Sequence, residues 1–299
     1  MRLVFLGSPP DAVPALRALH DRGHEIALVV TQPDRRRQRG TALVPTPVKV
    51  AAEELGVPVR TPHRSREIID DVAATGAELG VVVAFGQLLP PALLAAVHLG
   101  FVNVHFSLLP RWRGAAPVER AILAGDRETG VCLMQIEEGL DTGPVYACER
   151  TTIGEQETAG ELRERLSGVG TRLLIEVVPR LPDITPEPQR GEPTYAEKLA
   201  PEEFRLDPHR PADELARLVR AGNPHPGAWM RVDGRRVKVL RARAEDTKHA
   251  PGQLLWPGKL ATVDGSLRLE EVQVEGRRPI SAEAWMNGLR TRHLTVDDA

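Results

Sequence analysis

The stretch RLVFLGSPPDAVPALRALHDRGHEIALVV at residues 2–30 decides the fold class. Its first apolar run, residues 2–6, is separated by the turn sequence GSPP from an amphipathic helical pattern. A second apolar run follows at residues 26–30. Two buried strands around one helix make a β-α-β unit, so the sequence predicts a parallel sheet with right-handed crossovers.

The same alternation continues through the first two thirds of the chain. Further short apolar runs lie at residues 79–84, 101–104 and 131–136, and helical patterns lie at residues 91–97, 115–123 and 157–180. Strands that alternate with helices in this way are typical of an α/β domain. The sequence therefore predicts one such domain over residues 1–181.

The composition changes after that domain. Residues 182–204 hold five prolines and few apolar side chains, which is typical of a linker between domains. Residues 205–299 begin with a helical pattern at 212–221. Short alternating runs separated by Asp-Gly turns follow it, at residues 236–240, 260–263, 267–269 and 271–274. This spacing predicts a smaller antiparallel β-barrel domain over residues 205–299.

Composition and charge narrow the class of protein. The 299 residues are 41% hydrophobic and 27% charged, which is typical of a globular fold. The net charge of -2 does not by itself indicate a partner that is a polyanion. It hides an uneven distribution, because residues 1–204 sum to -6 and residues 205–299 to +4. The sequence DRRRQR at residues 34–39 follows a predicted strand on the side where α/β sheets bind ligands, although most arginine runs are only solvated surface.

The cysteines and the N-terminus bear on the compartment. Cys132 and Cys148 are too few for a disulfide framework and lack the spacing of a zinc site, so a reducing compartment is the simpler interpretation. The N-terminal MRLVFLGSPP has no signal-peptide apolar region, and no apolar run reaches the roughly 18 residues of a membrane span. We expect a soluble, monomeric, cytoplasmic protein with no membrane partner.

The polar residues that follow the middle strands are candidates for catalysis. The first turn, GSPPDAVP, lacks the glycine spacing of a dinucleotide site, which disfavours a nicotinamide enzyme. In FVNVHFSLLPRWRGAAP at residues 101–117, Asn103 and His105 share one face of a predicted strand. An amide beside an imidazole can bind a developing oxyanion and move a proton. An isolated Asn-x-His is more often a structural pair that ends a strand.

A second candidate is the acidic loop EEGLDTGP at residues 137–144. Gly139 and Gly143 flank Asp141, so the backbone can turn and bring the carboxylate toward a neighbouring strand end. A carboxylate there would orient His105 and favour its protonated form. Taken alone, the loop is better explained by an aspartate that bonds its own turn.

Together these motifs resemble the folate-dependent formyltransferases. The resemblance rests on NVHFSLLPRWRGAAP from residue 103, ETGV from residue 128 and GLDTG from residue 139, and it covers residues 2–150 almost continuously. Within the family, the chain is most similar to the members that act on methionyl-tRNA. That similarity rests on TQPD (31–34), PTPVKV (45–50), TYAEKL (194–199), AGNPHPGAW (221–229) and VKV (237–239).

The resemblance implies a Rossmann-like catalytic domain, an OB-like barrel, 10-formyltetrahydrofolate as co-substrate, no metal, and initiator methionyl-tRNA as partner. It implies catalytic roles for Asn103, His105 and Asp141. The folate-contacting residues that it implies are Phe85, Gly86, Gln87, Leu88, Ser107, Leu108, Leu109 and Pro110. The tRNA-contacting residues that it implies are Arg35, Arg36, Arg37 and Arg39.

The sequence departs from the family pattern at two places. Phe106 stands where relatives usually carry a small residue or proline, and Thr41 and Ala42 stand where lysines are usual.

The sequence leaves two other functions open. A formyltransferase acting on a small amine, such as an amino-sugar nucleotide or a glycinamide ribonucleotide, would share the catalytic residues without needing the C-terminal domain. A catalytically inactive RNA-binding protein is disfavoured by the intact Asn-His-Asp set.

Overall fold

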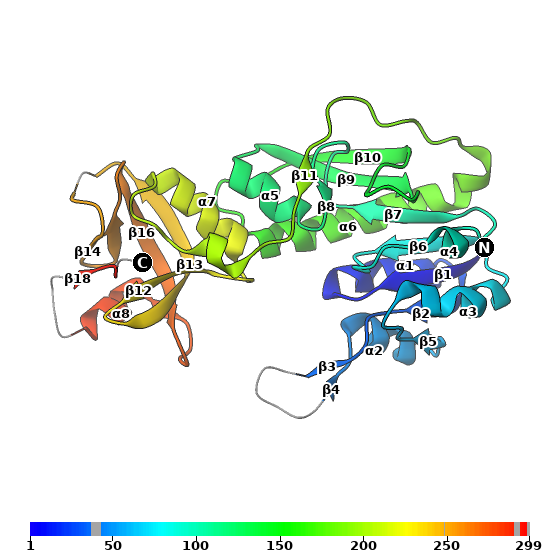
Figure 1. Cartoon of the computed structure of the whole chain (residues 1–299), viewed down its shortest axis with the longest axis horizontal. Coiled ribbons are helices and arrows are strands. Elements are labelled where there is room, and N and C mark those ends of the chain that lie inside the picture. Colours follow the sequence, from blue (N-terminus) through cyan, green and yellow to red (C-terminus); the bar gives the residue numbers. More distant parts are fainter. Residues whose placement is uncertain (37–42, 248, 290–293, 298–299) are drawn as a thin grey trace. The chain divides into compact units, whose positions relative to one another are not determined.

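The computed structural model describes residues 1–36, 43–247, 249–289 and 294–297, which fold into two compact units (Figure 1). The first unit contains residues 1–117, 128–152 and 163–196. The second contains residues 118–127, 153–162 and 197–299. Among the described residues, no helix is long and apolar enough to span a membrane.

The first unit is built on a seven-stranded sheet with the order β10-β9-β7-β6-β1-β2-β5. Five neighbouring strands are parallel, which confirms the predicted parallel sheet, and β9 runs antiparallel to both β7 and β10. The strands are β1 (Arg2–Gly7), β2 (Glu25–Val30), β5 (Val59–Arg60), β6 (Leu79–Val83), β7 (Phe101–His105), β9 (Glu128–Gln135) and β10 (Val145–Thr152).

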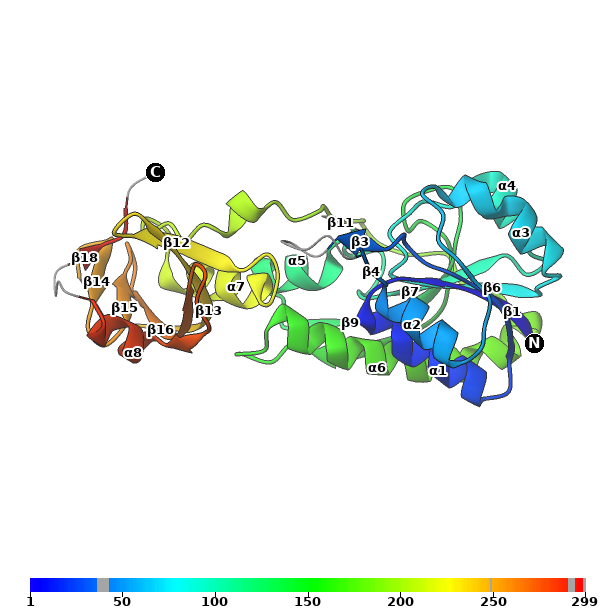
Figure 2. The same ribbon diagram turned by 90° about the horizontal axis from the view of Figure 1, so that it is seen from below.

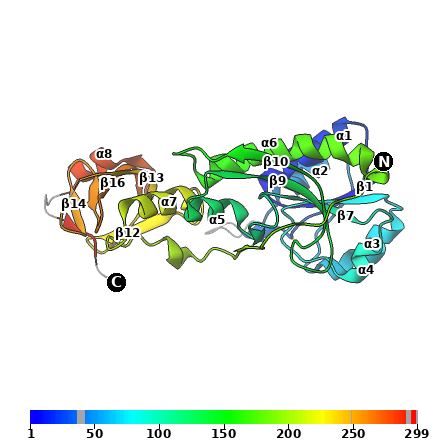
Figure 3. The same ribbon diagram turned by 90° about the horizontal axis from the view of Figure 1, so that it is seen from above.

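Helices cover both faces of this sheet. Figures 2 and 3 show α1 (Val13–Asp21), α2 (Pro47–Glu54) and α6 (Ala159–Val177) on one face, with α3 (Ile69–Ala74) and α4 (Pro91–Leu94) on the other. Gly170 allows α6 to approach the sheet, because a Cβ atom there would lie 2.5 Å from a methyl group of Val104. Because α6 covers this face of β7, the polar side chains that could take part in catalysis must lie on the opposite face.

The second unit is an antiparallel sheet with helices beside it. Its strand order is β12-β13-β16-β15-β14-β18, β17 pairs with β16, and a bridge between Val232 and Val296 joins the first strand to the end of the last, as expected for the predicted barrel. The strands are β12 (Ala228–Val232), β13 (Arg235–Glu245), β14 (Gln253–Leu255), β15 (Lys259–Ala261), β16 (Ser266–Val274), β17 (Ile280–Ser281) and β18 (Leu294–Thr295). The helices are α5 (Pro117–Ala124), α7 (Ala212–Gly222) and α8 (Ala282–Asn287).

Short elements complete the chain. The 3-10 helices are η1 (Pro10–Ala12), η2 (Ser65–Ile68), η3 (Val178–Asp183) and η4 (Pro201–Phe204). A small hairpin, β3 (Arg35–Arg36) with β4 (Leu43–Val44), follows β2. A parallel pair, β8 (Arg113–Gly114) with β11 (Tyr195–Ala196), connects two segments that are far apart in the sequence.

Two details of the strands were not predicted. The apolar runs at 267–269 and 271–274 form the single strand β16, not two strands. Cys132 of β9 and Cys148 of β10 form a disulfide. The sequence had indicated two cysteines in a reducing compartment, and the bond corrects this interpretation. It was not predicted because β10 was not recognised; the antiparallel pairing of β10 with β9 places the two cysteines opposite each other.

Candidate active site

Strand β7 positions the first two candidate residues. Val102 and Val104 are buried in the sheet, and Asn103 and His105 alternate with them, so both polar side chains project from the opposite face. The His105 side chain is only 5% exposed, whereas Asn103 is partly exposed. The structure thus places an accessible amide beside a buried imidazole at the carboxyl end of a central strand.

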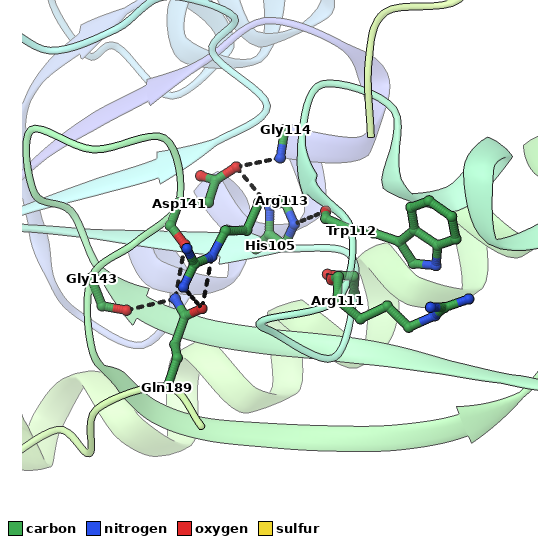
Figure 4. A network of polar contacts seen from close by, with 9 residues as sticks. His105, Arg111, Trp112, Arg113, Gly114, Asp141, Gly143 and Gln189 are labelled. Atoms are coloured by element: carbon green, nitrogen blue, oxygen red, sulfur yellow. Dashed lines mark hydrogen bonds and ion pairs between the residues drawn. The ribbon is translucent and has the colours of Figure 1, made fainter. Parts of the chain in front are cut away.

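Both nitrogens of His105 face protein groups (Figure 4). Nε2 lies 2.9 Å from the carbonyl oxygen of Trp112, and Nδ1 lies 3.7 Å from Oδ2 of Asp141. Because a carbonyl only accepts hydrogen bonds, this contact fixes a proton on Nε2. Nδ1 is therefore the nitrogen that faces the Asp141 carboxylate.

The loop between β9 and β10 carries Asp141 to this position. Asp141 has a positive φ of 51°, and Gly143 lies so close to the backbone that a Cβ atom would be 2.0 Å from the Gln135 oxygen. Only glycine therefore allows the loop to fold back here. The Gly114 N–H donates to Oδ2 of Asp141 at 2.8 Å, a charge-assisted bond that aims the carboxylate at His105.

The loop after β7 supplies the Trp112 carbonyl. The Ser107 hydroxyl donates to the Arg111 carbonyl at 2.6 Å, and Trp112 follows with a positive φ of 61°. The Trp112 N–H donates to the Thr194 hydroxyl at 2.9 Å, and the Arg113 N–H donates to the Thr194 carbonyl at 2.8 Å. Thr194 was noted in the sequence only as part of the family resemblance, and its contact with this loop was missed.

Gln189 is a further site residue that the sequence analysis missed (Figure 4). Its amide nitrogen donates to the carbonyl oxygens of Asp141 and Gly143, both at 2.8 Å. Its amide oxygen accepts from Nε and Nη2 of Arg113, at 3.0 and 2.6 Å. No local pattern marks this glutamine, because it lies in the proline-rich segment that was predicted to be a linker.

The residues predicted to contact folate follow two adjacent parallel strands, β6 and β7. They therefore lie at the same edge of the sheet, where α/β folds bind ligands. The Leu88 side chain is 72% exposed, while Phe85 is buried. Ser107 is also fully buried, and its hydroxyl is used within its own loop. The others are at least partly exposed, namely Gly86, Gln87, Leu108, Leu109 and Pro110.

The residues predicted to contact tRNA begin at the β3–β4 hairpin. Arg35 is exposed and lies with Arg36 in β3, whereas Arg37 and Arg39 fall outside the described residues. An ion pair of 2.7 Å between Lys49 and Asp34 fixes the chain just before β3, and its hydrogen bond raises the pKa of Lys49. In the described part of the chain, no cluster of three His, Cys, Asp or Glu side chains could hold a metal ion.

Comparisons with known proteins identify the family of the chain. Residues 1–178 match the family model described as formyl transferase, and residues 198–290 match the one described as formyl transferase, C-terminal domain. The chain is 50% identical over 291 residues to a methionyl-tRNA formyltransferase of Cereibacter sphaeroides, with 96% of each chain covered.

Two solved structures share the fold. HypX from Aquifex aeolicus, in complex with tetrahydrofolic acid, has a TM-score of 0.70 at 19% identity; the match covers 96% of this chain and 47% of HypX, so this chain spans about half of HypX. WlaRD, a sugar 3N-formyl transferase, has a TM-score of 0.67 at 15% identity, with 93% of this chain and 99% of that one covered.

Proposed function

The chain belongs to the formyl transferase family, and on this basis we propose that it transfers the formyl group of 10-formyltetrahydrofolate to the α-amino group of initiator methionyl-tRNA. The observation that carries the proposal is the 50% identity to a methionyl-tRNA formyltransferase over 96% of both chains. This similarity extends through the second unit.

The edge of the sheet that follows β6 and β7 fits a folate co-substrate. Leu88 exposes 72% of its apolar side chain there, which is a suitable surface for a flat heterocycle. Gly86 has a positive φ of 80° and is exposed, so the backbone beside Leu88 is open to a ligand. Tetrahydrofolic acid is bound by HypX, which shares the fold.

The reaction joins the amine nitrogen of the aminoacyl end to the formyl carbon and breaks the bond from that carbon to N10 of the folate. A proton moves from the amine to N10, and negative charge develops on the formyl oxygen. Asn103 is partly exposed in the middle of β7, two residues before its carboxyl end, and we assign its amide N–H to that oxygen. Removal of a single donor of this kind typically raises the barrier by roughly 2.7–4 kcal/mol.

His105 and Asp141 act as a pair. With Nε2 held by the Trp112 carbonyl, the exchangeable proton resides on Nδ1, 3.7 Å from the Asp141 carboxylate. A proton held on this pair would place positive charge beside the developing oxyanion. We assign to this pair the transfer of the proton released by the attacking amine.

Neither alternative function is favoured. The sugar formyl transferase WlaRD shares the fold at only 15% identity, and this level of likeness does not extend to the acceptor. An inactive RNA-binding protein would not need Asn103, His105 and Asp141 on adjacent strand ends. We further propose that Arg35 and the basic segment at residues 205–299 contact the tRNA, and that the protein acts as a cytoplasmic monomer.

The proposed acceptor is tested by direct competition between amines. Purified protein is incubated with 10-formyltetrahydrofolate and either charged initiator tRNA, an amino-sugar nucleotide or glycinamide ribonucleotide, and formylated product is quantified. We expect N-formylmethionyl-tRNA and no product from the two small amines. Formylation of a small amine, with none of the tRNA, would overturn the proposal.

A further inference from the structure

Gln189 links the two loops that hold His105, and this link has a consequence for catalysis. We propose that Gln189 is a positioning residue, whose side-chain amide sets the place of the Asp141 carboxylate relative to the imidazole. The inference rests on the proposed formyl transfer. The side chain of Gln189 is hydrogen-bonded to neither His105 nor the Asp141 carboxylate, so it acts through the backbone that carries them.

The amide of Gln189 uses its full hydrogen-bonding capacity. A primary amide has two N–H donors and an oxygen with two lone pairs. Both donors go to one loop, at the Asp141 and Gly143 carbonyls, and both lone pairs go to Arg113 of the other loop. Because all four bonds are made, the side chain has one favoured orientation and fixes the separation of the two loops.

The partners of Gln189 are adjacent to the groups that contact the histidine. Arg113 stands between Trp112, whose carbonyl accepts from His105, and Gly114, whose N–H donates to the Asp141 carboxylate. Figure 4 shows the glutamine below this arrangement, with its bonds reaching both loops. A shift of either loop would therefore change the 3.7 Å separation of Asp141 and His105.

The two loops need such a support because their backbones are unfavourable. Asp141 and Trp112 both have a positive φ, at 51° and 61°. A residue with a side chain keeps this conformation only when surrounding contacts enforce it. Gln189 bonds the carbonyl of Asp141 itself, and Thr194, five residues later in the same segment, bonds the N–H of Trp112. Residues 182–196 of the predicted linker thus lie in the first unit and bind its catalytic loops.

The first test is a double-mutant cycle on turnover. We expect Gln189→Ala to lower kcat by roughly 10–100-fold, since a misplaced catalytic group has effects of this size. The KM values for both substrates should stay near those of the parent, because Gln189 contacts neither. In an Asp141→Asn background the same change should have almost no effect, because the carboxylate that it positions is gone. An equal loss in both backgrounds would overturn the proposal.

A second variant and a matched control address folding. Gln189→Glu keeps the oxygen that accepts from Arg113 but replaces the donor with an oxygen facing two carbonyls, so we expect a loss at least as large as for alanine. Gln156→Ala, at an exposed turn, should behave as the parent. If the parent itself fails to formylate tRNA, the proposed function is wrong. If the parent is active and Gln189→Glu matches it, only the positioning role is wrong.

The third test does not depend on activity. The Gly114 N–H is bonded to the Asp141 carboxylate, so its hydrogen exchange reports whether that carboxylate is in place. In Gln189→Ala we expect exchange at Gly114 to accelerate at least ~10-fold, while the buried amide of Val82 in β6 stays unchanged. Equal acceleration at both amides would indicate general destabilisation, and no change at Gly114 would contradict the positioning role.

Discussion

Asp141 in the first unit and Glu161 in the second are both carboxylates that face a basic side chain, yet they are held in opposite ways. Glu161 accepts from the N–H and the hydroxyl of Thr158, both at 2.9 Å, and it also pairs with Arg241. The Thr158 backbone bond, followed by the bond to Arg241, lowers the pKa of Glu161 to about 2. Asp141 receives one backbone N–H and stands 3.7 Å from His105.

The difference separates a structural carboxylate, Glu161, from the one that we propose to be catalytic, Asp141. Glu161 forms a capping box at the start of α6 and accepts hydrogen bonds on both carboxylate oxygens, and its side chain is 47% exposed. Asp141 is 18% exposed, so its interaction with His105 is less screened by water, and its looser contact leaves room for a proton to move. Replacing the carboxylate by an amide should therefore lower activity at Asp141 and stability at Glu161.

The largest effect is expected for Asp141→Asn. The amide keeps the shape and can still accept from the Gly114 N–H, but it no longer places a negative charge beside His105. We expect kcat for formylation to fall by roughly 10²–10⁴-fold, as for other acids that orient a catalytic histidine. Urea unfolding should show a change in stability of less than ~1 kcal/mol. A variant with the turnover of the parent would mean that Asp141 has no role beyond its own turn.

A smaller loss of activity is expected for Asn103→Ala. The substitution removes one donor to the oxyanion, which should lower kcat by roughly 10²–10³-fold with little change in the folate KM. Steady-state kinetics with each substrate varied in turn measures the two constants. Asn287→Ala, an exposed position on α8, is the matched control. A main effect on the folate KM would assign Asn103 to binding and not to the reaction.

Much of the first unit could be predicted because its central strands are buried on both faces. Parallel strands of this kind are continuous apolar runs, as at Leu79–Val83, and are visible in a single sequence. The apolar run at residues 101–104 likewise predicted that Asn103 and His105 lie on one face of β7. Strand β10 was missed because it lies at the sheet edge and carries exposed polar residues such as Arg150 and Thr152.

The second unit shows why an apolar pattern can mislead. In β16 the buried positions are Leu267 and Leu269 and then Val272, so the alternation changes phase at the glutamate pair between them. Register irregularities in the pairing with β13 lie opposite this point. An irregularity of this kind interrupts the alternation of buried and exposed residues within a strand. The sequence pattern therefore predicted two strands where the structure has one.

Gln189 could not have been found from the sequence. Its partners Asp141 and Arg113 are 48 and 76 residues away, and only the folded chain brings them together. A single glutamine among prolines has no spacing that indicates a role. Asp141 was recognised through the family resemblance, whereas its contact with Gly114 depends on the positive φ of two loops, which a single sequence does not reveal.

The smallest effect is expected for Glu161→Gln, and it should be confined to stability. The carboxylate has its pKa lowered from 4.5 to about 2, so folding favours its charged form. That stabilisation is fully present above pH 4.5 and is lost as the pH falls toward 2. Because the side chain is 47% exposed, solvent screening limits the contribution to ~1 kcal/mol or less.

The measurement is urea unfolding of the parent and Glu161→Gln at a series of pH values, with the exposed Glu283→Gln as control. Glutamine keeps an acceptor for Thr158 but loses the charge that faces Arg241. The variant should be less stable at neutral pH and converge with the parent in acid, while kcat stays that of the parent. A difference that persists unchanged into acid would assign the effect to the helix cap and not to the charge, and a loss of kcat would remove the distinction between the two carboxylates.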